Sequence, residues 1–94
     1  MTGKNEDRSR TGEVTAGPGG AMTDEVGVIT GDLTLTTTLD DDGLARFRVQ
    51  YTGADEWYTL SGGPREASPD VLPDLHEKAL DALREGGAAE APKP

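Results

Sequence analysis

The chain has 94 residues and no cysteine, and 18 acidic residues against nine basic ones give it a formal net charge of −9. A chain of this length forms a single domain at most, and no disulfide can stabilise it. The negative charge repels nucleic acids and anionic membranes at long range, and no apolar stretch is long enough to span a membrane. Since no signal-peptide pattern is present, we expect a soluble, cytoplasmic protein.

The two ends of the chain are predicted to be disordered tails. Residues 1–23 are rich in Gly, Thr and charge and contain Gly17-Pro18-Gly19-Gly20. Val14 and Met22 are their only sizeable apolar residues beyond the initiator methionine. Residues 87–94 consist mostly of Gly, Ala and Pro. Neither segment buries enough apolar surface to offset the loss of chain entropy.

The predicted folded domain is residues 24–86, near the size at which one hydrophobic core is only marginally sufficient. We therefore expect a dimer interface or a tightly bound partner to stabilise it. Its first turn is predicted at Gly31-Asp32, a two-residue hairpin signal. Closing this hairpin places Val28 opposite Leu35, and Val26 then joins the same apolar face.

A second hairpin joins residues 33–39 to residues 44–52, and apolar side chains alternate along both runs. Placing the two apolar rows on one face sets Leu35 opposite Val49. That register closes through the three-residue loop Asp41-Asp42-Gly43, whose last position needs the left-handed backbone that glycine adopts readily.

A third hairpin is predicted to turn through the four residues Gly53-Ala54-Asp55-Glu56. Tyr58 then faces Tyr51, and Leu60 faces Val49 on the same apolar side. A slip of one residue would move every side chain to the other face, so the agreement of three turns indicates a four-stranded antiparallel β-meander.

Residues 68–86 are the only predicted helix, with Asp70 as its cap and Gly86 at its end. One apolar stripe runs along it, formed by Leu72, Leu75, Ala79, Leu80 and Leu83. Packing this stripe on the apolar face of the sheet gives an α+β fold, ββββα, in which one C-terminal helix covers one face of the meander. The other face, the open face, stays uncovered.

The open face is the predicted partner-binding surface. Its candidate residues are Thr36, Thr38, Arg46, Arg48, Gln50 and Trp57. An aromatic ring beside arginines can stack on planar groups and hydrogen-bond with them. In the alternative arrangement Trp57 turns into the core and Tyr58 points outward.

No motif indicates catalysis, a metal or a cofactor. The run Asp40-Asp41-Asp42-Gly43 lacks the ligand spacing of a calcium loop. His76 is the only histidine, and without cysteine or a motif-placed carboxylate it leaves little for acid–base or nucleophilic chemistry. We therefore predict that the protein is not an enzyme.

The leading hypothesis is a small regulator, adaptor or accessory protein that binds a protein partner, or a second copy of itself as a homodimer, through the open face. A first alternative is a single-stranded nucleic-acid binder that uses Trp57, Arg46 and Arg48 for stacking, although the net charge argues against it. A second is a small-ligand-binding protein with a pocket between helix and sheet. The residues nearest that pocket would be Tyr51, Tyr58 and His76.

Overall fold

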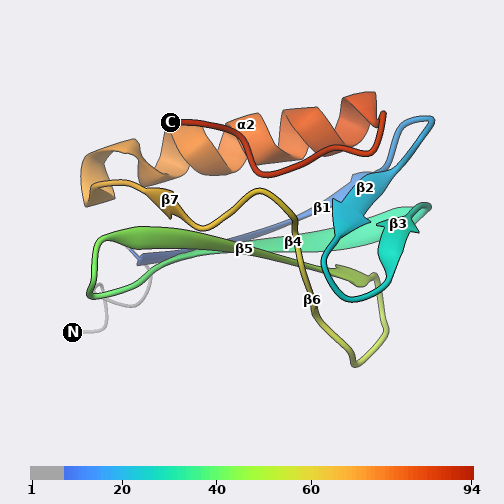
Figure 1. Cartoon of the computed structure of the whole chain (residues 1–94), viewed down its shortest axis with the longest axis horizontal. Coiled ribbons are helices and arrows are strands. Elements are labelled where there is room, and N and C mark those ends of the chain that lie inside the picture. Colours follow the sequence, from blue (N-terminus) through green and yellow to red (C-terminus); the bar gives the residue numbers. More distant parts are fainter. Residues whose placement is uncertain (1–7) are drawn as a thin grey trace.

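The computed structural model describes residues 8–94 and shows an α+β fold. Its strands are β1 (Ser9–Thr15), β2 (Ala21–Thr23), β3 (Gly27–Ile29), β4 (Asp32–Leu39), β5 (Leu44–Tyr51), β6 (Tyr58–Thr59) and β7 (Arg65–Glu66). A 3-10 turn at Pro69–Val71 leads into the helix α2 (Leu72–Glu85). The main antiparallel sheet has the order β1-β4-β5-β6, with β7 also paired to β5, and α2 packs on one face of it (Figure 1). β2 and β3 form a separate hairpin at one end of the sheet.

The central hairpin, β4–β5, has the predicted register. Leu35 pairs with Val49, and the same register runs from Leu33 to Leu39. Gly43 has a φ of 82° and its amide donates to the Asp40 carbonyl at 3.0 Å. The alternating apolar rows of the two strands face α2 and form the centre of the core, as the sequence predicted. Tyr51 at the end of its row is the exception, because it is 43% exposed.

The sheet is not a simple meander, because β1 lies beside β4. Gly12 pairs with Leu35 and Val14 with Leu33, in the position predicted for residues 26–30. The prediction of a disordered tail is therefore wrong from Ser9 onward, while residues 1–7 of that tail lie outside the described part of the chain. β1 packs against the helix at two of its residues. Val14 is buried, at 7% exposure, and Gly12 has no side chain, so the helix can approach the strand closely there.

The hairpin predicted at Gly31-Asp32 is also wrong. β3 pairs with β2, not with β4, so Val28 lies opposite Met22. Val26 and Val28 are consequently 53% and 46% exposed, whereas Ile29 is buried in the core. Gly31, with a φ of 89°, turns the chain between β3 and β4 and breaks the continuous register on which the prediction depended.

The third hairpin keeps the predicted faces but not the predicted partners. Tyr58 pairs with Val49 instead of Tyr51, and Leu60 donates its amide to the Phe47 carbonyl at 3.0 Å. The register is thus shifted by two residues. Since side chains alternate with a period of two, this shift leaves each residue on its predicted face.

All five residues of the predicted apolar stripe of α2 are buried, and so is His76. The helix begins at Leu72, after the 3-10 turn, so Asp70 is not its cap. Gly86 ends it with a φ of 80°. Within residues 8–94, no helix combines the length and the apolar character needed to cross a membrane.

Both glycine-rich ends of the domain are held by backbone hydrogen bonds. Gly17 donates its amide to the Leu83 carbonyl at 2.9 Å, and Ala89 donates to Gly20 at 2.9 Å. Ala89 and Ala91 are 8% and 4% exposed. The prediction that residues 87–94 are disordered is therefore wrong, because backbone pairing orders this segment without large apolar side chains.

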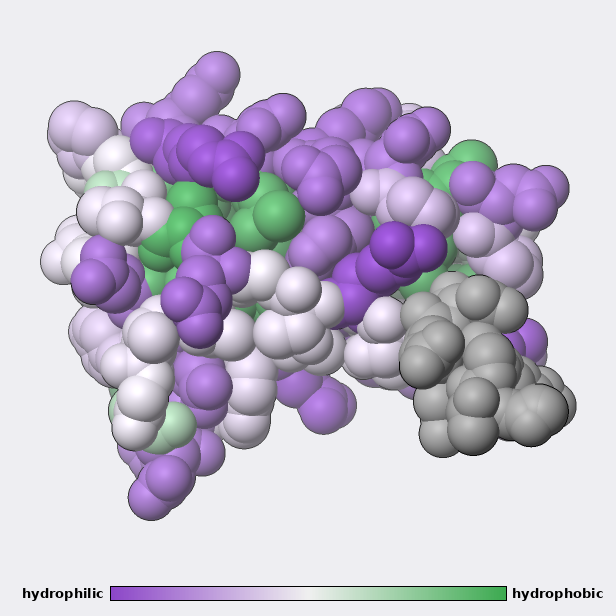
Figure 2. Space-filling view, turned by 180° about the vertical axis from the view of Figure 1, so that it is seen from behind, coloured by the Kyte–Doolittle hydropathy of each residue, from purple (hydrophilic) through white to green (hydrophobic). Residues whose placement is uncertain are grey.

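Seen from the opposite side, where β1 lies in front, most of the surface is polar (Figure 2). Hydrophobic residues are visible there only in small areas, the largest of them below the polar side chains along the top of the view (Figure 2). Among the described residues visible in this view, no broad apolar patch occurs.

Candidate functional site

The open face carries the predicted site residues on neighbouring strands. Thr36 pairs with Arg48, and Thr38 pairs with Arg46. Their side chains point away from α2, because the alternate residues of the same strands form the core. β1 extends this face with further hydroxyl groups, and Thr11 Oγ1 lies 3.1 Å from Thr36 Oγ1.

Trp57 lies at the end of the loop between β5 and β6, which projects on the side opposite α2 (Figure 1). Its side chain is 43% exposed. It lines a hollow of about 140 Å³ together with Thr36, Thr38 and Arg48. The structure thus brings four of the six predicted residues together, and it is Tyr58, not Trp57, that packs against the core.

The other two predicted residues are engaged elsewhere. Arg46 donates through Nε to Asp40 Oδ2, and its Nη2 lies 3.6 Å from Asp42 Oδ2. The hydrogen bond to Asp40, with the charges of both carboxylates, raises the pKa of Arg46. Gln50 donates through Nε2 to the Ala54 carbonyl at 2.9 Å. Both side chains therefore stabilise adjacent loops.

Glu25, which the sequence did not single out, closes one border of the open face. Its carboxylate accepts the Thr59 amide at 2.7 Å and the Thr59 hydroxyl at 2.7 Å. These hydrogen bonds, with a smaller effect of the nearby Arg48 charge, lower the pKa of Glu25. The contact joins residues far apart in the chain, so no local pattern could have predicted it.

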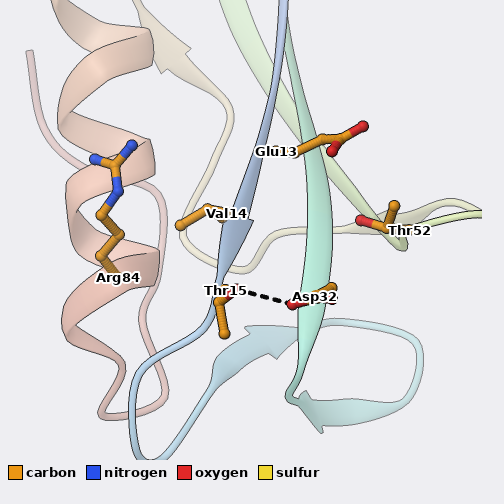
Figure 3. A pocket seen from close by; sticks show the side chains of 6 residues that line it. All are labelled: Glu13, Val14, Thr15, Asp32, Thr52 and Arg84. Atoms are coloured by element: carbon orange, nitrogen blue, oxygen red, sulfur yellow. Dashed lines mark hydrogen bonds between the residues drawn. The ribbon is translucent and has the colours of Figure 1, made fainter.

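A second, larger hollow of about 390 Å³ lies at the end of β1 (Figure 3). It is lined by Glu13, Val14, Thr15, Asp32, Thr52 and Arg84. Thr15 donates its hydroxyl to Asp32 Oδ1 at 2.8 Å, and Arg84 donates to Asp81 at 2.7 Å. Sequence reasoning missed this hollow because it placed residues 1–23 in a disordered tail.

His76 is buried between the helix and the sheet, where its Nδ1 lies 2.8 Å from the buried Thr37 hydroxyl. Burial lowers the pKa of His76 below its ordinary value of 6.5; Glu77 opposes this shift and Arg10 adds to it. Within residues 8–94, no three His, Cys, Asp or Glu side chains are grouped in a way that could hold a metal ion. The hollows described above are lined by residues other than His76, Tyr51 and Tyr58.

The burial of His76 predicts a pH-dependent stability. The unfolded chain takes up a proton near pH 6.5, but the folded protein resists protonation of His76. The free energy of unfolding should therefore fall as the pH drops from about 7 through this range. Urea unfolding of His76→Gln, which keeps a hydrogen-bonding side chain without the titration, should show a weaker dependence between neutral and mildly acidic pH. Equal slopes for the two proteins would contradict this assignment.

Comparison with protein-family models, with curated proteins and with solved structures found no match to this chain.

Proposed function

We propose that this protein is a non-enzymatic interaction module that binds another protein through the open face, with Trp57 and Arg48 at the centre of the contact. The observation that carries the proposal is the position of Trp57. Its side chain is 43% exposed and lines a hollow on a sheet face that no helix covers within residues 8–94. Tryptophan and arginine are the residues most enriched among the energetic centres of protein interfaces.

The size of this hollow favours a partner's side chain over a complete small ligand. Its volume is about 140 Å³, whereas pockets for small molecules measure roughly 300–1,000 Å³. A single protruding side chain fits such a hollow, and the surrounding hydroxyl groups can bond to the partner's backbone. The uncharged threonines also keep the cost of desolvating the face low.

The ion pairs support a protein partner over single-stranded nucleic acid. Arg46 is held by Asp40 and Asp42. Of the two predicted arginines, Arg48 alone has no ion pair within residues 8–94. Binding single strands requires a positively charged groove that follows several phosphates. Arg48 does not provide such a groove on the described part of the open face.

A second copy of the chain is one partner that the open face could accept, and we retain the homodimer as part of the proposal. Sedimentation across the micromolar range tests it, and a strict monomer would remove it. We also place the protein in the cytoplasm, an expectation that rests on the sequence alone.

The proposed function is tested by reversing one charge on the open face. Arg48→Glu should abolish the capture of a specific protein from a lysate of the source cells, because a buried carboxylate would replace the central cation. Lys78→Glu, an equal charge reversal on the exposed side of α2, is the matched control and should capture that protein normally. The captured protein should then bind the purified, unaltered chain directly. Its affinity for the Arg48→Glu variant should be lower by about tenfold or more. Equal capture by both variants would contradict the proposal.

A further inference from the structure

The outer edge of β1 is a long strand edge with little of the usual protection, since Arg10 and Glu13 are its only charged residues. All seven residues from Ser9 to Thr15 pair with β4 in unbroken register, without a bulge. The strand contains no proline and no lysine. Within residues 8–94, no strand pairs with its other side. Natural sheets normally shorten, bend, charge or cover such an edge, because it offers a template for another strand.

The opposite edge of the same sheet shows this protection clearly. β6 and β7 have two residues each. Beyond them, Asp24 donates its amide to the Thr59 carbonyl at 3.0 Å and Ser61 donates to Met22 at 2.9 Å. The C-terminal segment adds a bond from Ala91 to Ser61 at 2.8 Å. The fold therefore covers one edge with its own backbone, whereas no backbone within residues 8–94 pairs with the outer edge of β1.

The hydrogen-bond pattern identifies the free groups of β1. Ala16 donates its amide to the Gly31 carbonyl at 2.9 Å, which fixes the phase of the β1–β4 ladder. Because inward and outward bonding alternate along an antiparallel strand, every second residue from Ala16 bonds to β4. The residues whose backbone groups point outward are Ser9, Thr11, Glu13 and Thr15.

The surroundings of this edge provide space and charge for a partner strand. The hollow of about 390 Å³ lies along the second half of β1 and is bordered by Arg84 of α2 (Figure 3). Val14 points toward the helix, whereas Glu13 points to the other side of the strand (Figure 3). On that other side the carboxylates of Glu13 and Asp32 both line the hollow.

We propose that β1 accepts an extended segment of another protein as an additional strand, and that this segment carries lysine or arginine at alternate positions facing Glu13 and Asp32. Charge complementarity argues for this occupant, because the chain has a formal net charge of −9 and neither Glu13 nor Asp32 forms an ion pair within residues 8–94. Arg84, the basic residue that also lines the hollow, is paired with Asp81. The same net charge opposes a second copy at this edge. The hollow beside this edge shares no lining residue with the Trp57 hollow. An experiment can therefore disprove binding at one site without disproving it at the other.

The test uses backbone amide hydrogen exchange in the full chain, measured by nuclear magnetic resonance. The probe is a short, end-blocked peptide of alternating lysine and valine. Its binding should slow exchange of the Thr11 and Glu13 amides by about tenfold or more, because a bonded amide exchanges only when the added strand opens. The indole signal of Trp57 should stay unchanged.

Two variants and a second peptide make the test specific. Thr11→Pro removes an outward amide but no backbone bond to β4, so it should fold and lose the protection at Glu13. The side-chain contact with Thr36 is lost both in this variant and in the valine control. Thr11→Val keeps the amide and is the matched control. A glutamate–valine peptide should bind much more weakly, and Glu13→Lys should reverse the order of the two peptides even if the proline variant does not fold.

Four results would overturn the proposal. Unchanged exchange at a saturating concentration of the lysine peptide excludes strand addition, and equal protection by the glutamate peptide excludes charge selection. Protection that grows with protein concentration without any peptide indicates a second copy at the edge. A change in the indole signal of Trp57, with no change in exchange at Thr11 and Glu13, would show that the peptide binds the open face instead of the β1 edge.

Discussion

Gly17→Ala and Gly20→Ala should each lower the free energy of unfolding by about 3 kcal/mol or more, near the upper end of single-substitution effects. A Cβ atom at Gly17 would lie 2.2 Å from the Arg84 carbonyl oxygen, and one at Gly20 would lie 2.2 Å from the Ile29 carbonyl oxygen. In both cases the obstructing atom is backbone, which cannot move aside cheaply. Gly20 also has a φ of 65°, where an L-residue is strained.

Gly27→Ala is the matched control for these two substitutions. Gly27 has a φ of 76°, but a Cβ atom there meets nothing within 4 Å. It should therefore show only the backbone strain, about 1 kcal/mol. Urea unfolding followed by circular dichroism measures all three. Equal losses would show that the glycine-rich turn does not pack closely against the end of α2 at Gly17 and the end of β3 at Gly20.

A chain shortened to begin at Ala16 should lose cooperative unfolding altogether. β1 covers one side of the core, and a Cβ at Gly12 would lie 3.2 Å from Leu80 Cδ1, so α2 rests directly on this strand. Without it, buried Leu80 and His76 would be exposed and β4 would become an unpaired edge.

Restoring β1 as a separate molecule provides the control for this truncation. A synthetic peptide of residues 8–16 should recover the helical signal of the shortened chain, because the missing strand adds through the same register. Unchanged melting of the shortened chain on its own would mean that residues 9–15 behave as the disordered tail that their composition indicates.

The elements that could be predicted are those whose pattern is local. The alternation in β4 and β5, with Gly43 in the turn, determines that hairpin because only one register places both apolar rows together. The stripe of α2 is likewise determined by helical spacing. β1 carries only one buried apolar residue, Val14, and its remaining stabilisation is backbone pairing, which leaves little trace in composition.

The candidate site was predictable in its face but not in its detail. The prediction of which side chains share a face is correct although the register of the third hairpin is wrong. The observed register differs from the predicted one by two residues, and an even shift leaves every side chain on the same face. The engagement of Arg46 by Asp40 and of Gln50 by Ala54 depends on loop geometry that alternation does not encode. The sequence therefore predicted that Trp57 and Arg48 lie together. The contacts of Arg46 and Gln50 beside them could be found only in the structure.

The most direct test of the proposed function is the accessibility of Trp57, the only tryptophan, to acrylamide quenching. In the free protein its fluorescence should be red-shifted and readily quenched, as expected for a side chain that is 43% exposed. Adding the protein identified by the charge-reversal experiment should shift the emission to the blue and protect it from quenching. A Trp57 that is already shielded in the free monomer, or one whose quenching is the same with and without the partner, would contradict binding through the open face.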